Sequence, residues 1–95
     1  MAESRWLKEA SEDFNRLHSF LEAKDIRVAK RAALTVLKGV QILENSPEIG
    51  RPRPDGSKLR ELFLSFGSGA YVIRYMIENE HVVITRIWHS REDRK

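Results

Sequence analysis

Three arginines in the C-terminal half are the residues best suited to bind a phosphate or a carboxylate. Arg60, Arg74 and Arg86 each fall within a segment whose composition is typical of a β-strand. If the strand register places them on one face, their guanidinium groups form a basic concavity for such anions. In the alternative arrangement each arginine pairs with a nearby acid, the candidates being Glu61, Glu78 and Glu80. One sequence does not fix strand register, so both arrangements stay open.

His89 is the residue best suited to transfer a proton, because the unperturbed pKa of histidine, about 6.5, lies near working pH. A lone histidine at a strand end also serves as a plain hydrogen-bonding group. Ser90 follows it directly, and adjacent residues of a strand point to opposite faces. The pair therefore does not predict a Ser-His-acid triad. We interpret the stretch "RIWHSRED" (86–93) as a strand end that binds a partner rather than as a catalytic tip.

Four further residues are candidates for binding a partner. Trp88 is either an interface anchor, since tryptophan is enriched at binding hot spots, or a core residue. Arg51 and Arg53 lie on "RPRPDG" (51–56), where the prolines favour an extended, stiff segment. In one interpretation, these two arginines extend from the segment to bind nucleic acid or an acidic groove. In the other, the segment is a plain connecting loop. Arg91 adds a cation beyond the last predicted strand.

Length and composition limit the classes of protein. The 95 residues predict a single domain, 1–95, without a disulfide or a thiolate zinc site, because cysteine is absent. His18, His81 and His89 lie too far apart to suggest a metal site, and we expect no cofactor. No apolar run approaches the roughly 20 residues that span a bilayer, and "MAESRWLKEA" lacks the apolar centre of a signal peptide. These features predict a cytoplasmic protein without membrane contact.

The net charge of +3 is unevenly distributed along the chain. Residues 1–48 carry eight basic and eight acidic side chains, whereas residues 49–95 carry nine against six. A clustered basic surface attracts phosphates or acidic proteins, although an excess this small also fits a solvated loop.

Apolar spacing predicts a helical hairpin in the first half of the chain. Spacings of four and three place apolar residues on one face of a first helix, namely Ala10, Phe14, Leu17 and Leu21. Its opposite side is expected to carry Glu12, Asp13, Arg16 and Glu22. Asp25 is a suitable N-cap for a second helix, which Pro47 ends. The buried face of that helix is predicted to hold Ala29, Ala33, Val36, Val40 and Leu43.

Three strand-like segments follow from Leu59 onward. "LRELFLSF", "AYVIRYMI" and "HVVITRIW" are separated by "GSG" and "ENE", both short enough for hairpin turns. They predict a three-stranded antiparallel meander, with the helical hairpin on one face and a short edge strand near Trp6. The last strand is apolar on both sides, with Val82, Ile84 and Trp88 expected on one and Val83 and Ile87 on the other. Two helices can cover only one face of the sheet. We therefore expect part of the second face to be covered either by a partner or by Trp88 and the tail.

In this order and spacing the chain resembles the ParE/RelE superfamily of toxins from bacterial type II toxin–antitoxin systems. The resemblance covers about residues 4 to 93. The motifs that carry it are Pro47-x-x-Gly50-Arg51, Leu59-Arg60-Glu61-Leu62, Tyr71-x-Ile73-x-Tyr75 and His89-Ser-Arg91-x-Asp93. It implies an α+β fold of a short strand, a two-helix hairpin and a three-stranded antiparallel meander.

The superfamily divides by mechanism. RelE-like members are ribosome-dependent endoribonucleases, and many carry a C-terminal tyrosine or histidine for proton transfer. ParE-like members are thought to poison DNA gyrase without catalytic residues of their own. Here the last segment has no tyrosine, and Lys58 is the only lysine between the helices and the sheet. Both features favour the ParE branch, and hence a toxin that is not an enzyme.

The resemblance also implies partners. A ParE-like toxin arrests growth through DNA gyrase and is neutralised by a cognate antitoxin in a hetero-oligomer. The expected binding residues are Arg51, Arg53, Arg60, Arg74, Arg86, Trp88, His89 and Arg91. The first alternative is a ribonuclease acting on mRNA at the ribosome, with Arg60, Arg74 and Arg86 supplying charge and His89 acting as acid and base. The second is a non-toxic interaction module with the same fold.

Overall fold

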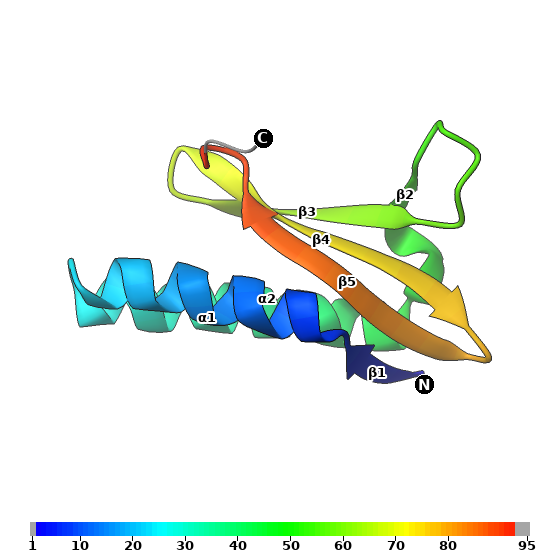
Figure 1. Ribbon diagram of the computed structural model, residues 1–95, viewed down its shortest axis with the longest axis horizontal. Helices are drawn as coiled ribbons and strands as arrows, with labels where there is room; N and C mark the ends of the chain where they lie inside the picture. The colour runs from blue at the N-terminus through cyan, green and yellow to red at the C-terminus, as the bar shows by residue number, and fades with distance from the viewer. Residues whose placement is uncertain (1, 93–95) are drawn as a thin grey trace.

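A computed structural model describes residues 2–92; residue 1 and residues 93–95, including Asp93 of the terminal motif, lie outside the described part. Within it, two long helices cover one face of a five-stranded sheet (Figure 1). The elements in chain order are β1 (Glu3–Trp6), α1 (Lys8–Glu22), α2 (Ile26–Asn45), the 3-10 turn η1 (Pro47–Ile49), β2 (Arg51–Pro52), β3 (Arg60–Phe66), β4 (Gly69–Glu78) and β5 (His81–His89).

The strand order of the sheet is β1-β5-β4-β3-β2. β3, β4 and β5 form the predicted antiparallel meander, and β1 lies parallel to β5 at one edge, where a short strand was expected. The predicted α+β fold is confirmed. The other edge holds a strand that was not predicted, because Arg51 and Pro52 pair with Glu61 and Arg60. A two-residue strand within a proline-rich segment leaves no periodic pattern in the sequence.

α1 buries the predicted apolar face, with one correction. Ala10 is fully buried, and Phe14 packs against the same core. Asp13 was expected on the polar side of the helix, but it is 3% exposed. The expectation was wrong because Asp13 follows Ala10 by three residues and precedes Leu17 by four, which places its carboxylate on the buried face.

α2 begins and ends where the sequence indicated. The Asp25 carboxylate caps it by accepting a hydrogen bond from the Arg27 N–H, and the helix stops two residues before Pro47. Gly39 lies directly against the side chains of Leu64 and Ile73, with no room for a Cβ atom. The glycine therefore lets α2 pack closely beneath β3, which offsets its low helix propensity.

A β-bulge in β5 changes which residues face the helices. The register moves from Arg74 opposite Arg86 to Tyr75 opposite Ile84, so that Thr85 is the extra residue. Ile87 is consequently buried together with Val82 and Ile84, whereas Trp88 belongs to the opposite face. The predicted grouping of Trp88 with Val82 and Ile84 was wrong, because strict alternation does not hold across a bulge.

The buried Tyr75 hydroxyl holds η1 and β2 in place. It donates a hydrogen bond to the Pro47 carbonyl at 2.6 Å and accepts one from the Gly50 N–H at 2.8 Å. Burial raises the pKa of Tyr75, so the hydroxyl keeps the proton that it donates. Gly50 touches the tyrosine ring and has no space for a side chain. This contact fixes the backbone that presents Arg51.

None of the helices in the described part of the chain is long and apolar enough to cross a membrane.

Candidate functional site

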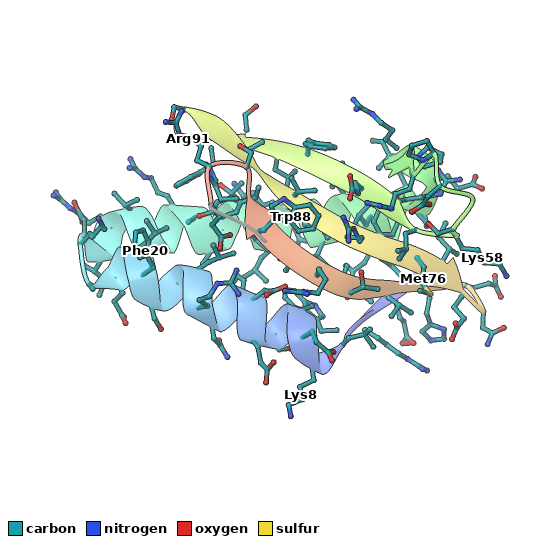
Figure 2. The ribbon with its side chains drawn as sticks, turned by 45° about the horizontal axis from the view of Figure 1, so that its top comes forward. Lys8, Phe20, Lys58, Met76, Trp88 and Arg91 are labelled. Carbon is teal, nitrogen blue, oxygen red and sulfur yellow. The ribbon has the colours of Figure 1, made fainter. Side chains whose placement is uncertain are left out.

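Four of the eight predicted binding residues lie together on the sheet face turned away from α1 and α2, namely Arg51, Arg53, Arg74 and Trp88. We call it the open face and define it by Arg51, Glu61, Phe63, Val72, Arg74 and Trp88. No helix described within residues 2–92 lies on this face, and Trp88 stands on the β5 part of it (Figure 2). Trp88 therefore covers part of this face. One of the two alternatives drawn from the sequence named Trp88 together with the tail, and residues 93–95 of that tail lie outside the described part of the chain.

A carboxylate organises the centre of the open face. Glu61 Oε2 accepts hydrogen bonds from Arg74 Nε at 2.9 Å and from Arg53 Nη1 at 3.0 Å, and Arg74 Nη2 lies 2.8 Å from the same oxygen. The Arg74 guanidinium also lies 4.7 Å from the centre of the Trp88 ring, in a cation–π arrangement. Arg53, Arg74 and Trp88 are thus brought together, and Arg74 pairs with an acid that the sequence named.

Arg51 lies beside this cluster on β2. Its guanidinium is 5.3 Å from the centre of the Phe63 ring, and its side chain is exposed. Phe63 is itself 47% exposed. Arg51 and Phe63 therefore extend the cationic and aromatic surface toward the β2 edge of the sheet.

Arg60 does not share the open face. It lies opposite Tyr75 in the sheet register, and its Nη1 donates to the carbonyls of Glu48 and Gly50 at 3.1 and 3.0 Å. Arg60 therefore ties η1 to β3 from the helix side. The single-face arrangement of Arg60, Arg74 and Arg86 does not occur.

Arg86 is held at the sheet edge by Asp13 of α1. Arg86 Nε and Nη2 donate to the two carboxylate oxygens at 2.7 and 3.1 Å, and Arg16 Nη1 donates at 2.7 Å. The N–H of Ile87 donates to the same carboxylate at 2.9 Å. Burial raises the pKa of Asp13, but the bonds from Arg86, Arg16 and Ile87 outweigh burial and hold it below its usual value.

His89 uses both ring nitrogens inside the chain. Nδ1 accepts the N–H of Arg91 at 3.2 Å, so the proton resides on Nε2, which donates to the Phe66 carbonyl at 3.0 Å. The ring stands edge-on to Tyr71 with 4.9 Å between ring centres. His89 therefore links the end of β5 to the β3–β4 turn, away from Arg74 and Arg60.

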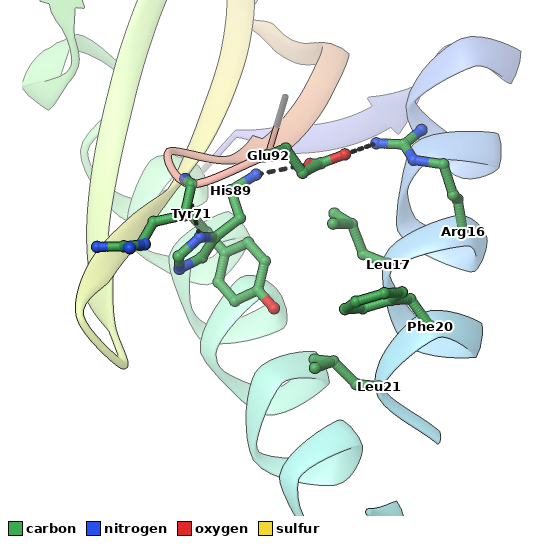
Figure 3. Close-up of a pocket in the computed structure, with 8 residues that line it drawn as sticks. Arg16, Leu17, Phe20, Leu21, Tyr71, His89 and Glu92 are labelled. Atoms are coloured by element: carbon green, nitrogen blue, oxygen red, sulfur yellow. Dashed lines mark hydrogen bonds and ion pairs between the residues drawn. The ribbon is translucent and has the colours of Figure 1, made fainter. Parts of the chain in front are cut away.

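A groove of about 440 Å³ opens between the last turns of α1, the start of β4 and the end of β5. Leu17, Phe20 and Leu21 face Tyr71 and His89 across it (Figure 3). Phe20 is 61% exposed, and Lys24 lies 4.7 Å from the centre of its ring. Arg91 lines the groove from the other side. The groove is apolar inside and has cations at its rim. Of its apolar α1 residues, Leu17 and Leu21 were predicted only as core residues, and Phe20 was not predicted to have a role.

An ion pair closes one end of the groove. Arg16 Nη2 lies 2.9 Å from Glu92 Oε1, and Glu92 Oε2 accepts the backbone N–H of His89 at 2.9 Å (Figure 3). Sequence reasoning missed the roles of Asp13 and Glu92. For Asp13 the sequence did contain a signal, because this acid has the same spacing from Ala10 and Leu17 as the apolar core residues have from one another. The pairing between Arg16 and Glu92 leaves no local pattern, because the two residues are far apart in the chain.

Residues 2–92 contain no group of three or more histidine, cysteine, aspartate or glutamate side chains that could hold a metal ion.

Comparison with known proteins identifies the family. Residues 4–94 match the family model of the ParE toxin of type II toxin–antitoxin systems, parDE. Toxin RelE1 of Caulobacter vibrioides is 40% identical over 85 residues, covering 90% of this chain and 89% of that protein. Toxin RelE3 of the same organism is 34% identical over 85 residues, covering 90% of each. The chain belongs to the ParE toxin family, within the ParE/RelE superfamily of type II toxin–antitoxin toxins.

Solved structures share the fold. A chain of the chromosomal ParDE system of P. aeruginosa superposes with a TM-score of 0.76 at 19% identity, covering 94% of this chain and 96% of that one. A chain of the intact E. coli RelBE toxin–antitoxin complex gives a TM-score of 0.65 at 14% identity, with 97% and 100% covered. The resemblance stated from the sequence motifs is confirmed, and the names of these relatives span both mechanistic branches.

Proposed function

We propose that this toxin arrests growth in the cytoplasm by docking on DNA gyrase and holding its cleaved-DNA state. The supporting observation is that the groups a nuclease needs are already engaged and lie apart. Both nitrogens of His89 have partners in the chain, and Arg86 and Arg60 are bound at two other places. Nuclease chemistry requires an acid–base group and charge stabilisation at one reacting centre, whereas docking requires only a surface.

The proposed mechanism is differential affinity. A protein that binds gyrase traps the cleaved state only if it binds that state more tightly than the resealed one. Exposed Arg51 and the neighbouring Arg74–Trp88 pair supply a surface with cationic and aromatic groups, and arginine and tryptophan are enriched at interface hot spots.

A gyrase cleavage assay tests this proposal. Purified protein is incubated with gyrase, supercoiled plasmid and ATP, and linear DNA after protease treatment is the expected product. Arg51→Glu reverses an exposed charge on the open face and is expected to reduce linear DNA about tenfold or more, as loss of one hot-spot contact does. Lys30→Glu makes the same charge change on exposed α2 and should leave cleavage unchanged. Unchanged supercoiling and no linear DNA would refute the proposal.

A ribosome-dependent ribonuclease is the second candidate. The observation that favours it is the open face itself, where Arg51 and Arg74 lie with exposed Phe63 and with Trp88, since RNA bases stack on aromatic and guanidinium planes. Cleavage of mRNA in translating ribosomes that is lost in Arg74→Ala would support this candidate. Cleavage that survives an Arg86→Ala, His89→Ala double change would exclude the site assignment made from sequence.

We further propose that a cognate antitoxin neutralises this toxin in a hetero-oligomer. Family membership supports it, and so does the open groove beside exposed Phe20. We expect the isolated chain to melt at a lower temperature than its complex, because a ligand that binds only the folded state stabilises it. Equal melting temperatures at saturating partner would contradict this.

A further inference from the structure

Tyr71 on β4 is a buried tyrosine whose hydroxyl takes no part in the fold. The residue is 3% exposed, and its ring packs against the rings of Phe66 and His89, with 5.3 and 4.9 Å between ring centres. Within residues 2–92 the Tyr71 hydroxyl has no hydrogen-bonding partner. The hydroxyl of buried Tyr75, by contrast, both donates and accepts a hydrogen bond. Buried polar groups are normally paired, so the free hydroxyl of Tyr71 points to a ligand.

The Tyr71 hydroxyl opens into the groove beside α1. Every fully enclosed side-chain nitrogen or oxygen in residues 2–92 has a partner, so the unpaired Tyr71 oxygen is reachable from outside. Tyr71 lines the groove, and its hydroxyl points across it toward Phe20 and Leu21 (Figure 3). Burial raises the pKa of Tyr71, and the nearby Glu92 carboxylate raises it further. The hydroxyl therefore keeps its proton and offers a donor to an occupant of the groove.

The groove has the dimensions of a small-molecule site. Its volume of about 440 Å³ falls within the range of about 300–1,000 Å³ that is usual for such sites. Apolar side chains of α1 form one wall, and His89 adds only its ring, since both of its nitrogens are bonded within the chain. The ion pair between Arg16 and Glu92 closes one end. A short molecule fits inside as a whole, whereas a protein segment would continue onto the surfaces outside.

The charges around the groove favour an anion. Arg91 lines the groove, and Lys24 lies against the ring of Phe20 at its wall. Neither cation pairs with a carboxylate in the part of the chain that the structure describes. Glu92 also lines the groove, but its carboxylate is already bound to Arg16 and to a backbone N–H. Two unpaired cations beside an apolar cavity attract a ligand that is both apolar and negatively charged.

We propose that this groove binds a small amphipathic carboxylic acid, with an acyl or aryl body and a single carboxylate. The apolar body lies against Leu17, Phe20 and Leu21. The ligand's carboxylate accepts a hydrogen bond from the Tyr71 hydroxyl and is attracted by the two unpaired cations. This site goes beyond the proposed function, because docking on gyrase does not require it. A bound acid would compete with any protein segment that enters the groove.

Decanoate is a suitable probe for this site. The isolated full chain is titrated with decanoate, and binding is followed by calorimetry and by amide chemical shifts. We expect saturable binding of one molecule, with the largest shifts at Phe20, Tyr71 and Arg91. Decanol has the same chain without the charge and is expected to bind about tenfold more weakly, since hydrogen bonds to charged groups are the stronger ones. Absence of saturation, or shifts centred elsewhere, would overturn the inference.

Tyr71→Phe removes the hydroxyl and nothing else. It is expected to weaken decanoate binding about fivefold, the usual effect of losing one hydrogen bond. It should leave the urea midpoint of the free chain unchanged, because the hydroxyl has no partner in the described fold. Tyr75→Phe is the matched control and should show the reverse, with a lower midpoint and unchanged decanoate affinity. Unweakened decanoate binding by Tyr71→Phe, or a lowered midpoint, would contradict a ligand-binding role of this hydroxyl.

A second pair of variants tests the apolar wall. Phe20→Ala removes a ring that is 61% exposed and lines the groove, and it is expected to weaken decanoate binding about tenfold through lost apolar contact. Leu34→Ala shortens a side chain of α2 that is 54% exposed and should leave the affinity unchanged. Equal losses in both variants would mean that decanoate binds to exposed apolar surface in general, which would overturn the assignment to this groove.

Discussion

Two carboxylates of this toxin each hold two arginines, but in opposite surroundings. Asp13 lies on the buried face of α1 with a side chain 4% exposed, and it binds Arg16, Arg86 and a backbone N–H. Glu61 lies on the open face with a side chain 17% exposed, and it binds Arg53 and Arg74. The Asp13 cluster joins a helix to a strand, whereas the Glu61 cluster joins side chains on a surface. Similar ion pairs therefore join two elements of the fold in one place and order the proposed binding surface in the other.

The largest expected effect is loss of the Asp13 charge. Asp13→Asn should lower the free energy of unfolding by about 3 kcal/mol, at the low end for breaking a buried pair because Arg16 and Arg86 regain water. Urea denaturation measures the change. Glu12→Asn, on the exposed side of the same helix, should change stability by no more than about 0.5 kcal/mol. A loss below about 1 kcal/mol at Asp13 would erase the contrast between the clusters.

Acid should unfold the protein through the same residue. The folded pKa of Asp13 lies below its usual value, so its stabilisation is complete above the unfolded pKa of about 3.9. That stabilisation is lost as pH falls through the folded pKa. Stability from urea titrations between pH 7 and pH 2 should decline in this window, and Asp13→Asn should flatten the decline. An equal decline in both proteins would assign acid sensitivity to other carboxylates.

A smaller effect is expected from the matching change at the surface cluster. Glu61→Gln should lower the free energy of unfolding by about 1 kcal/mol or less, since partly exposed ion pairs contribute little. The same urea experiment applies. The comparison with Asp13→Asn is between matched amide substitutions, and a larger loss at Glu61 than at Asp13 would reverse the assignment of roles.

The smallest expected effect is the coupling between Arg74 and Trp88. A double-mutant cycle with Arg74→Met and Trp88→Leu should give an interaction energy of about 0.5–1 kcal/mol, as cation–π pairs at partly exposed sites do. Denaturant unfolding of the four proteins measures this interaction energy. A coupling near zero would mean that the geometry on the open face contributes no stability and that Arg74 is positioned by Glu61 alone.

Local pattern was enough to predict most of the fold. The apolar spacing of the helices, the Asp25 cap, the Pro47 stop and the three strand segments all have signals within a few residues. The bulge at Thr85 and the two-residue strand at Arg51 have no such signal, because both are set by the register in which the segment pairs with another strand. Strand register likewise decided that Arg60 and Arg74 face opposite sides.

The candidate site was harder to predict than the fold for the same reason. The residue types were found, since Arg51, Arg53, Arg74 and Trp88 do gather on one face. Their organiser, Glu61, was named only as one of three possible partners for an arginine. Asp13 and Glu92 bind residues far away in the chain, at Arg86 and Arg16, and such pairings come from tertiary packing alone.

The parallel pairing of β1 with β5 has a consequence for synthesis. Glu3 pairs with His81 and Trp6 with Ile84, so the first strand has no partner until the last one has been translated. The same holds for Asp13, whose arginine and N–H partners at Arg86 and Ile87 come equally late. Contacts this distant in sequence form slowly, since a long loop must close first. A ribosome still making this toxin therefore holds an incomplete sheet, and the finished surface exists only after the last strand has emerged.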